Sequence, residues 1–274
     1  MTKPEFKDDF IFNIKKIEQI EPLLLTAAGQ TRLKNAVEKS ERANQNQKKQ
    51  IQKNIETAGF TCLQCGKCCE RTEADNSVYI LPEEIEQIEA AINLSRNEFI
   101  LPMLPDYFES AGNIEKNYLF NVLQSLDAQI DKDGQIHTFG WMLQRKNDGS
   151  CIFLDSETKK CAIYEIRPGL CRTYPFYIDE DGFSDCECDG IGKVKKTDEI
   201  VVNDLIAALQ KRVISDQEDY IKTSAVIKEK YDRLKLNSDE GNDLLKEQFE
   251  KNTISFVVYD STGVYSVDVL IKMN

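Results

Sequence analysis

Four cysteines fall within eight residues of this chain, in the segment Cys62-Leu63-Gln64-Cys65-Gly66-Lys67-Cys68-Cys69. The other five lie further along and are Cys151, Cys161, Cys171, Cys186 and Cys188. The 81 residues from 70 to 150 contain no cysteine. Thiols that only filled core positions would be scattered along the chain, so this distribution indicates that the two clusters hold a metal.

The first cluster has the spacing of a metal-binding loop. A C-x2-C pair lets two thiolates approach one metal, and Gly66 permits the tight backbone turn that this needs. Extending the pair to C-x2-C-x2-C supplies three ligands, as in bacterial ferredoxins, where a distant cysteine completes the [4Fe-4S] site. We expect that distant ligand in the second cluster. Cys69 directly follows Cys68 and its side chain diverges from it, so Cys69 either serves a second site or stays free.

The identity of the metal follows only in part from the ligands. Zinc and iron–sulfur clusters both accept four thiolates, and three evenly spaced cysteines plus a remote one favour iron–sulfur. The chain has one histidine, His137, which excludes most mixed Cys/His zinc fingers. It lies beside a turn, so we expect a surface or edge residue and not a ligand. The nine cysteines allow one metal site or two. The alternative to metal binding is that the thiols are inert or sense redox changes.

The residues around both clusters resemble a known family. They are Cys62-x2-Cys65-Gly66-x-Cys68-Cys69, Cys151-Ile152-Phe153-Leu154-Asp155, Cys161-x-Ile163-Tyr164-Glu165-x-Arg167-Pro168-x2-Cys171-Arg172-x-Tyr174-Pro175-Phe176 and Cys188-x-Gly190-Ile191-Gly192. Over residues 60 to 193 this pattern is similar to the YkgJ-type cysteine-cluster family, also described as zinc- or iron-chelating CxxCxxCC proteins. The flagellin lysine N-methylase FliB shares the cluster motif.

The resemblance implies a set of metal ligands. The eight recurring cysteines of the family correspond here to Cys62, Cys65, Cys68, Cys69, Cys151, Cys161, Cys171 and Cys188. Cys186 is then an additional cysteine. Arg167 and Arg172 flank Cys171, where they either steady an anionic cluster, bind an acidic substrate group, or pair with acids such as Asp155.

Charge and composition bound the partners and the location. The net charge is −12. Residues 1 to 60 carry eleven Lys/Arg against eight Asp/Glu, a net of +3, which leaves 24 against 39, or −15, for the rest. Such an acidic body repels phosphates, so we expect no nucleic acid partner, whereas a protein partner or protein substrate is allowed. With no basic, apolar leader and no run of 18 apolar residues, we expect a cytoplasmic protein without a membrane span.

The patterning predicts an α+β fold. We expect an irregular cysteine-rich core of short strands and loops, flanked by N- and C-terminal helices, in three segments, 1–59, 60–193 and 194–274. Helices are expected over 10–28, 30–57, 82–93, 197–234 and 242–251, with a short one beginning at the Ser95–Glu98 capping box. Strands are expected over 78–81 and 138–143, with hairpins around 177–183 and 254–271.

Two classes of function remain from the sequence. The first is a structural metal-binding module, in which the metal stabilises a poorly cored segment that contacts a partner protein. The second is an enzyme, either an iron–sulfur redox protein or a methyl-transfer protein. The chain shows no Gly-rich loop between a strand and a helix, and its spacing is C-x2-C-x2-C and not C-x3-C-x2-C, so neither common type of S-adenosylmethionine site is indicated.

Overall fold

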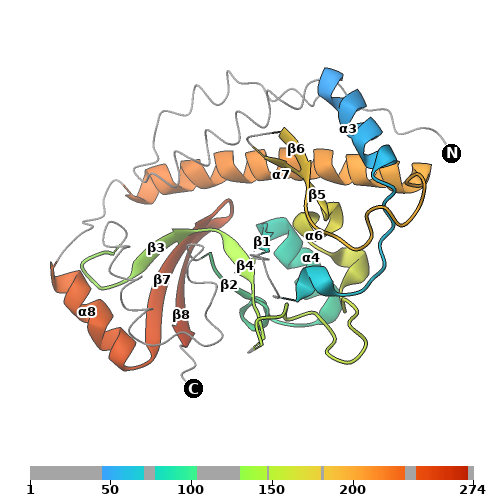
Figure 1. Ribbon diagram of the computed structural model, residues 1–274. Helices are drawn as coiled ribbons and strands as arrows, with labels where there is room; N and C mark the ends of the chain where they lie inside the picture. The colour runs from blue at the N-terminus through green and yellow to red at the C-terminus, as the bar shows by residue number, and fades with distance from the viewer. Residues whose placement is uncertain are drawn as a thin grey trace. The chain divides into compact units, whose positions relative to one another are not determined.

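The computed structural model describes residues 45–70, 78–103, 130–146, 148–179, 182–231 and 239–270. Helices and small sheets are both present, so the expected α+β class is confirmed (Figure 1). The chain divides into two compact units. Unit 1 consists of Met1–Leu63 and Gly169–Ile221, and unit 2 consists of Gln64–Pro168 and Lys222–Asn274. The three segments expected from the sequence remain a prediction. The helix expected over 10–28 lies outside the described residues.

Unit 1 contains three helices and a hairpin among its described residues. They are α3 (Gln45–Thr57), α6 (Gly169–Thr173), the antiparallel pair β5 (Phe176–Asp179) and β6 (Gly182–Asp185), and α7 (Glu199–Tyr231) as far as Ile221. The hairpin expected around 177–183 is confirmed. α3 confirms the end of the helix expected over 30–57, whose earlier part is not described.

A buried threonine joins the elements of unit 1. The Thr197 hydroxyl accepts a hydrogen bond from the Phe60 amide at 2.8 Å and donates one to the Ile55 carbonyl at 2.6 Å. It thus links the end of α3 to the start of α7, which begins where the sequence predicts. Apolar side chains on one face of α7 pack into the core of unit 1. The buried members of this core are Ile51, Ile55, Phe60, Phe176, Ile178, Val202, Leu205, Ile206, Leu209 and Val213.

Unit 2 contains two three-stranded sheets. In the first, β1 (Tyr79–Ile80), β4 (Trp141–Leu143) and β2 (Ile100–Pro102) are antiparallel in the order β1-β4-β2. In the second, β3 (Ile136–Phe139), β7 (Thr253–Asp260) and β8 (Gly263–Leu270) follow the order β3-β7-β8, as Figure 1 shows. The β7–β8 hairpin confirms the expected one. β3 pairs with β7 in parallel, which the sequence did not predict.

The single strand expected over 138–143 is wrong, because Gly140 divides it. Gly140 has φ 83°, in the left-handed region, and a Cβ there would lie 2.6 Å from the Tyr79 ring. Only glycine fits this bend without strain. The chain therefore leaves the second sheet after β3 and enters the first as β4.

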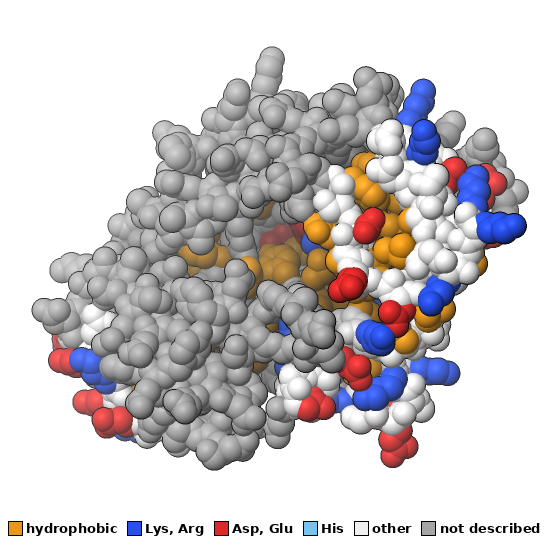
Figure 2. Space-filling model, in the orientation of Figure 1, with side chains coloured by type: hydrophobic (Ala, Val, Ile, Leu, Met, Phe, Trp, Pro, Cys, Tyr) orange, Lys and Arg blue, Asp and Glu red, His pale blue; other side chains and the backbone are white. Residues whose placement is uncertain are grey.

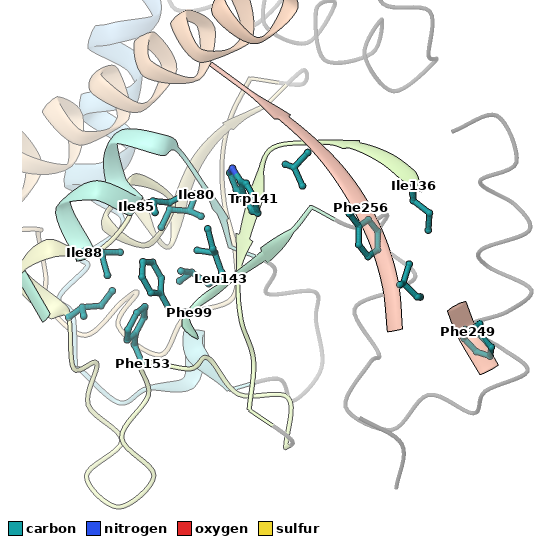
Figure 3. Packing of buried hydrophobic residues seen from close by; sticks show 14 of the residues in the cluster. Ile80, Ile85, Ile88, Phe99, Ile136, Trp141, Leu143, Phe153, Phe249 and Phe256 are labelled. Atoms are coloured by element: carbon teal, nitrogen blue, oxygen red, sulfur yellow. The ribbon is translucent and has the colours of Figure 1, made fainter. Parts of the chain in front are cut away.

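The helices of unit 2 follow their sequence signals. α4 (Pro82–Ile92) begins with proline, and α8 (Asp239–Glu250) precedes β7 as expected. The capping box is confirmed at a short helix, η2 (Arg96–Glu98), where the Ser95 amide and hydroxyl donate to the Glu98 carboxylate at 2.8 and 3.0 Å. These elements surround the core shown in Figure 3, in which Phe99 and Phe153 lie with ring centroids 5.7 Å apart.

The described surface bears mixed charge. On the face drawn in Figure 2, acidic and basic side chains of the described residues are interspersed. No helix within the described ranges combines the length and the apolar character needed to cross a bilayer.

The sequence predicts a surface or edge position for His137. Its strand β3 is an edge strand of the sheet, but its side chain is buried. Its side chain is 2% exposed. Nδ1 lies 2.9 Å from the Tyr259 hydroxyl and Nε2 lies 3.0 Å from the Asp131 carboxylate. Burial lowers the pKa of His137, an effect that outweighs the hydrogen bond to Asp131. The imidazole thus satisfies two other buried polar groups of unit 2.

Replacing His137 should remove a pH-dependent part of the stability. Because its pKa is lowered, the folded protein holds neutral imidazole where the unfolded chain binds a proton, so stability falls as the pH drops below about 6.5. His137→Gln should lose this dependence and about 1–3 kcal/mol of unfolding free energy, since buried partners lose their hydrogen bonds. Urea denaturation between pH 5.5 and 8 measures both. Tyr259→Phe keeps the imidazole and should keep the dependence; an unchanged pH profile in His137→Gln would contradict this interpretation.

Candidate metal centre

The first cysteine cluster ends in a tight turn. Gln64 and Gly66 both have positive φ, 50° and 76°. The following residues form the short helix η1 (Lys67–Cys69), in which the Cys69 amide donates to the Gly66 carbonyl at 2.8 Å. The backbone of this turn sets the directions in which the Cys68 and Cys69 side chains point. Their Sγ atoms are 3.9 Å apart.

Unit 2 brings this turn against part of the second cluster. The Cys151 amide donates to the Cys69 carbonyl at 2.8 Å, and the Cys151 side chain is near enough to raise the pKa of Cys69. Cys161 lies across a narrow hairpin, because Leu154 and Cys161 form an antiparallel bridge. We call Cys68, Cys69, Cys151 and Cys161 the unit 2 thiols. The fifth cysteine of this unit, Cys65, is exposed.

A second contact fixes the turn onto that hairpin. The Lys159 ammonium lies 2.7 Å from the Glu70 carboxylate. At Gly66, a Cβ atom would clash with the Lys159 carbonyl oxygen. The turn and the hairpin are therefore in backbone contact at a position that tolerates no side chain.

The charges around the unit 2 thiols favour thiolate at two of them. The hydrogen bond from Cys69 lowers the pKa of Cys68 to about 7, and the charge of Arg167 contributes. The same thiol lowers the pKa of Cys151 to about 7, helped by Arg145. The pKa of Cys69 is raised, because its proton is held by both neighbours. Burial raises the pKa of Cys161. Thiolate is the form that binds metals.

Two arginines supply the positive charge at this site. The Arg167 guanidinium lies 3.7 Å from the centre of the Tyr164 ring, and its Nε donates to the Tyr164 carbonyl at 2.9 Å. These contacts hold it in one orientation. Arg145 forms an antiparallel bridge with Cys151. The sequence analysis missed Arg145, because nothing in its spacing distinguishes it from a surface residue.

The remaining cysteines, Cys62, Cys171, Cys186 and Cys188, belong to unit 1. The Gly190 amide donates to Cys188 Sγ at 3.4 Å, and the Cys186 thiol donates to the Pro175 carbonyl at 3.3 Å. An amide directed at a sulfur stabilises thiolate and tunes a bound cluster. The Thr61 amide donates to the Gly190 carbonyl at 3.1 Å, so the residue before Cys62 lies beside the Cys188 loop. Each unit therefore combines members of both clusters.

The expected ligands are not arranged around a common point. Among the residues that the structure describes, no three His, Cys, Asp or Glu side chains could hold a metal ion as they stand. All nine cysteines are described, and none is in a disulfide. Metal–thiolate bonds are about 2.3 Å long, so binding requires side-chain rotation at these loops. The donor chemistry fits zinc or iron, and the contacts bring Cys69 beside both Cys68 and Cys151.

Comparison with known proteins supports metal binding. Residues 61–189, slightly under half of the chain, match the family model CxxCxxCC, described as a "Putative zinc- or iron-chelating domain", and this range contains all nine cysteines. A stretch of 30 residues is 57% identical to Uncharacterized protein MJ0661 of Methanocaldococcus jannaschii. The alignment covers 11% of this chain and 16% of that protein. No solved structure matches the chain.

Alanine at Gly66 should weaken the metal centre more than alanine at Gly192. Both glycines have positive φ, but a Cβ at Gly192 meets nothing within 4 Å, whereas one at Gly66 clashes with the Lys159 carbonyl. Each substitution should cost about 1–2 kcal/mol for the backbone conformation, and Gly66→Ala should cost more because the hairpin must move. Metal-to-protein ratio and urea midpoint test this. Equal metal retention in both variants would show that the contact at Gly66 does not matter.

Proposed function

We propose that the cysteine-rich region binds an iron–sulfur cluster and acts in redox chemistry. The proposed ligands are Cys62, Cys65, Cys68, Cys69, Cys151, Cys161, Cys171 and Cys188. The observation that best supports this is the hydrogen bond from the Cys151 amide to the Cys69 carbonyl, which brings a distant cysteine to the first cluster, as a ferredoxin-type loop needs. The family match supports zinc or iron and does not distinguish them.

The positive charge at the unit 2 thiols suits a bound cluster, as it would also suit zinc held by four thiolates. A cluster bound by four thiolates is anionic, and nearby cations and hydrogen bonds to sulfur determine its potential. The positive charges of Arg145 and Arg167 act on Cys151 and Cys68. In unit 1 the Gly190 amide donates a hydrogen bond to Cys188 Sγ, which also stabilises negative charge on sulfur. When bound, an iron–sulfur cluster would supply one-electron transfer, while these side chains hold it and balance its charge.

Anaerobic purification should yield a coloured protein. Iron and acid-labile sulfide should be present in similar amounts, and the visible absorbance should decrease reversibly on reduction with dithionite. The measurement is metal and sulfide analysis with absorbance spectroscopy. A colourless protein with stoichiometric zinc and no sulfide would overturn the iron–sulfur proposal and support a structural zinc module that contacts a partner protein.

The ligand set can be tested with neighbouring cysteines. Cys188→Ser and Cys151→Ser should each lower the metal content to less than half, because serine does not replace a thiolate ligand. Cys186→Ser is the matched control, two residues from Cys188 in the same loop and outside the proposed set. It should keep most of its metal. Equal loss from Cys186→Ser and Cys188→Ser would show that the set is assigned incorrectly.

A further inference from the structure

Cys69 lies between two other thiols. Its Sγ is 3.9 Å from that of Cys68, and the neighbouring Cys151 side chain raises its pKa. The backbone bond of 2.8 Å from the Cys151 amide to the Cys69 carbonyl makes these two residues direct neighbours. A single backbone hydrogen bond keeps two Cα atoms within about 7 Å of each other, and a disulfide spans Cα atoms roughly 4.4–6.8 Å apart.

We propose that Cys69 and Cys151 form a regulatory disulfide in the metal-free protein when it meets hydrogen peroxide or a related peroxide. The regulatory effect of this disulfide rests on the proposed function. The disulfide would use two of the proposed metal ligands, so oxidation prevents metal binding, and bound metal protects the two cysteines from oxidation. The two residues are in backbone contact as they stand, whereas no three of the described donor side chains form a chelate.

The reaction balances with one peroxide. The Cys151 thiolate attacks a peroxide oxygen, the O–O bond breaks, and the released hydroxide takes up a proton to form water. Cys151 is then a sulfenic acid. The Cys69 sulfur attacks the Cys151 sulfur, the S–O bond breaks, and a second water leaves with the thiol proton of Cys69. Two thiols lose two electrons and the peroxide is reduced to two waters.

Cys69 is a better partner for Cys151 than Cys68. Cys68 and Cys69 are consecutive residues of η1, and a disulfide between adjacent residues closes a small, strained ring. Cys69 has the backbone contact with Cys151. Cys69 and Cys151 are each half-buried, so a small oxidant can reach their sulfur atoms.

Peptide mapping of the full chain tests the pair. Metal is removed with a chelator under reducing conditions, the reductant is removed, and stoichiometric hydrogen peroxide is added before alkylation and tryptic digestion. Cleavage after Lys67 and Arg71 puts Cys68 and Cys69 in one peptide, 68–71, while Cys151 falls in 147–159. Trypsin does not cleave between Arg167 and Pro168, so Cys161 falls in 161–172 together with Cys171. The expected product links 68–71 to 147–159. Recovery of both peptides fully alkylated, or linked elsewhere, would overturn the proposal.

Adjacent variants identify the sulfur involved. Cys68→Ser should still form the link, and Cys69→Ser should lose it and leave Cys151 as a sulfenic acid that dimedone traps. Loss of the link in Cys68→Ser with retention in Cys69→Ser would contradict the assignment. Circular dichroism shows whether each variant is folded, and the wild-type map does not depend on either.

Metal binding separates this inference from the proposed function. Metal-loaded protein should form the link at least several-fold more slowly, and the oxidised protein should take up less than half of the iron or zinc bound by the reduced protein. Equal uptake by both forms would overturn the regulatory proposal and leave the metal centre intact. If the reduced protein binds neither metal, the proposed function fails, the regulatory consequence fails with it, and the map still decides whether the dithiol exists.

Discussion

The hydrogen bond from the Cys151 amide to the Cys69 carbonyl is the constraint on which the cysteine site of unit 2 depends. It joins two loops that are far apart in the chain, and closing so long a loop costs conformational entropy. The core of unit 2 offsets that cost. Phe153, two residues after Cys151, packs against Phe99 in the apolar cluster, so burial of its ring also positions the thiol (Figure 3).

The same arrangement recurs in unit 1. Phe60 precedes Cys62 by two residues and packs edge-on against Phe176, with ring centroids 5.4 Å apart. Phe176 follows Cys171 at the start of β5. In both units an aromatic anchor close in sequence to a cysteine is buried in the core. The apolar cores thus place the reactive loops, and the loops themselves need little regular structure.

The proposed metal site and the proposed disulfide share two sulfur atoms, those of Cys69 and Cys151. A thiolate is both the form that coordinates a metal and the form that attacks an oxidant. The position of Cys69 suits either outcome, because it lies beside the Cys68 thiol and in backbone contact with Cys151, and side-chain rotation would gather these donors. The cations Arg145 and Arg167 stabilise negative charge on sulfur in both cases.

Local patterns in the sequence determined the donor type, the loop at Gly66, the capping box at Ser95 and Glu98, and the final hairpin, because each depends on residues close together in the chain. Only the tertiary structure decided that Gly140 splits one apolar run between two sheets, and that β3 pairs with β7. The buried His137 contacts Tyr259, which lies 122 residues further along the chain. The positive charge of Arg145 lowers the pKa of Cys151, an effect that depends on how these residues are placed in the fold. These contacts are made between segments distant in sequence, and a periodicity of two or of 3.6 residues carries no information about which segments meet.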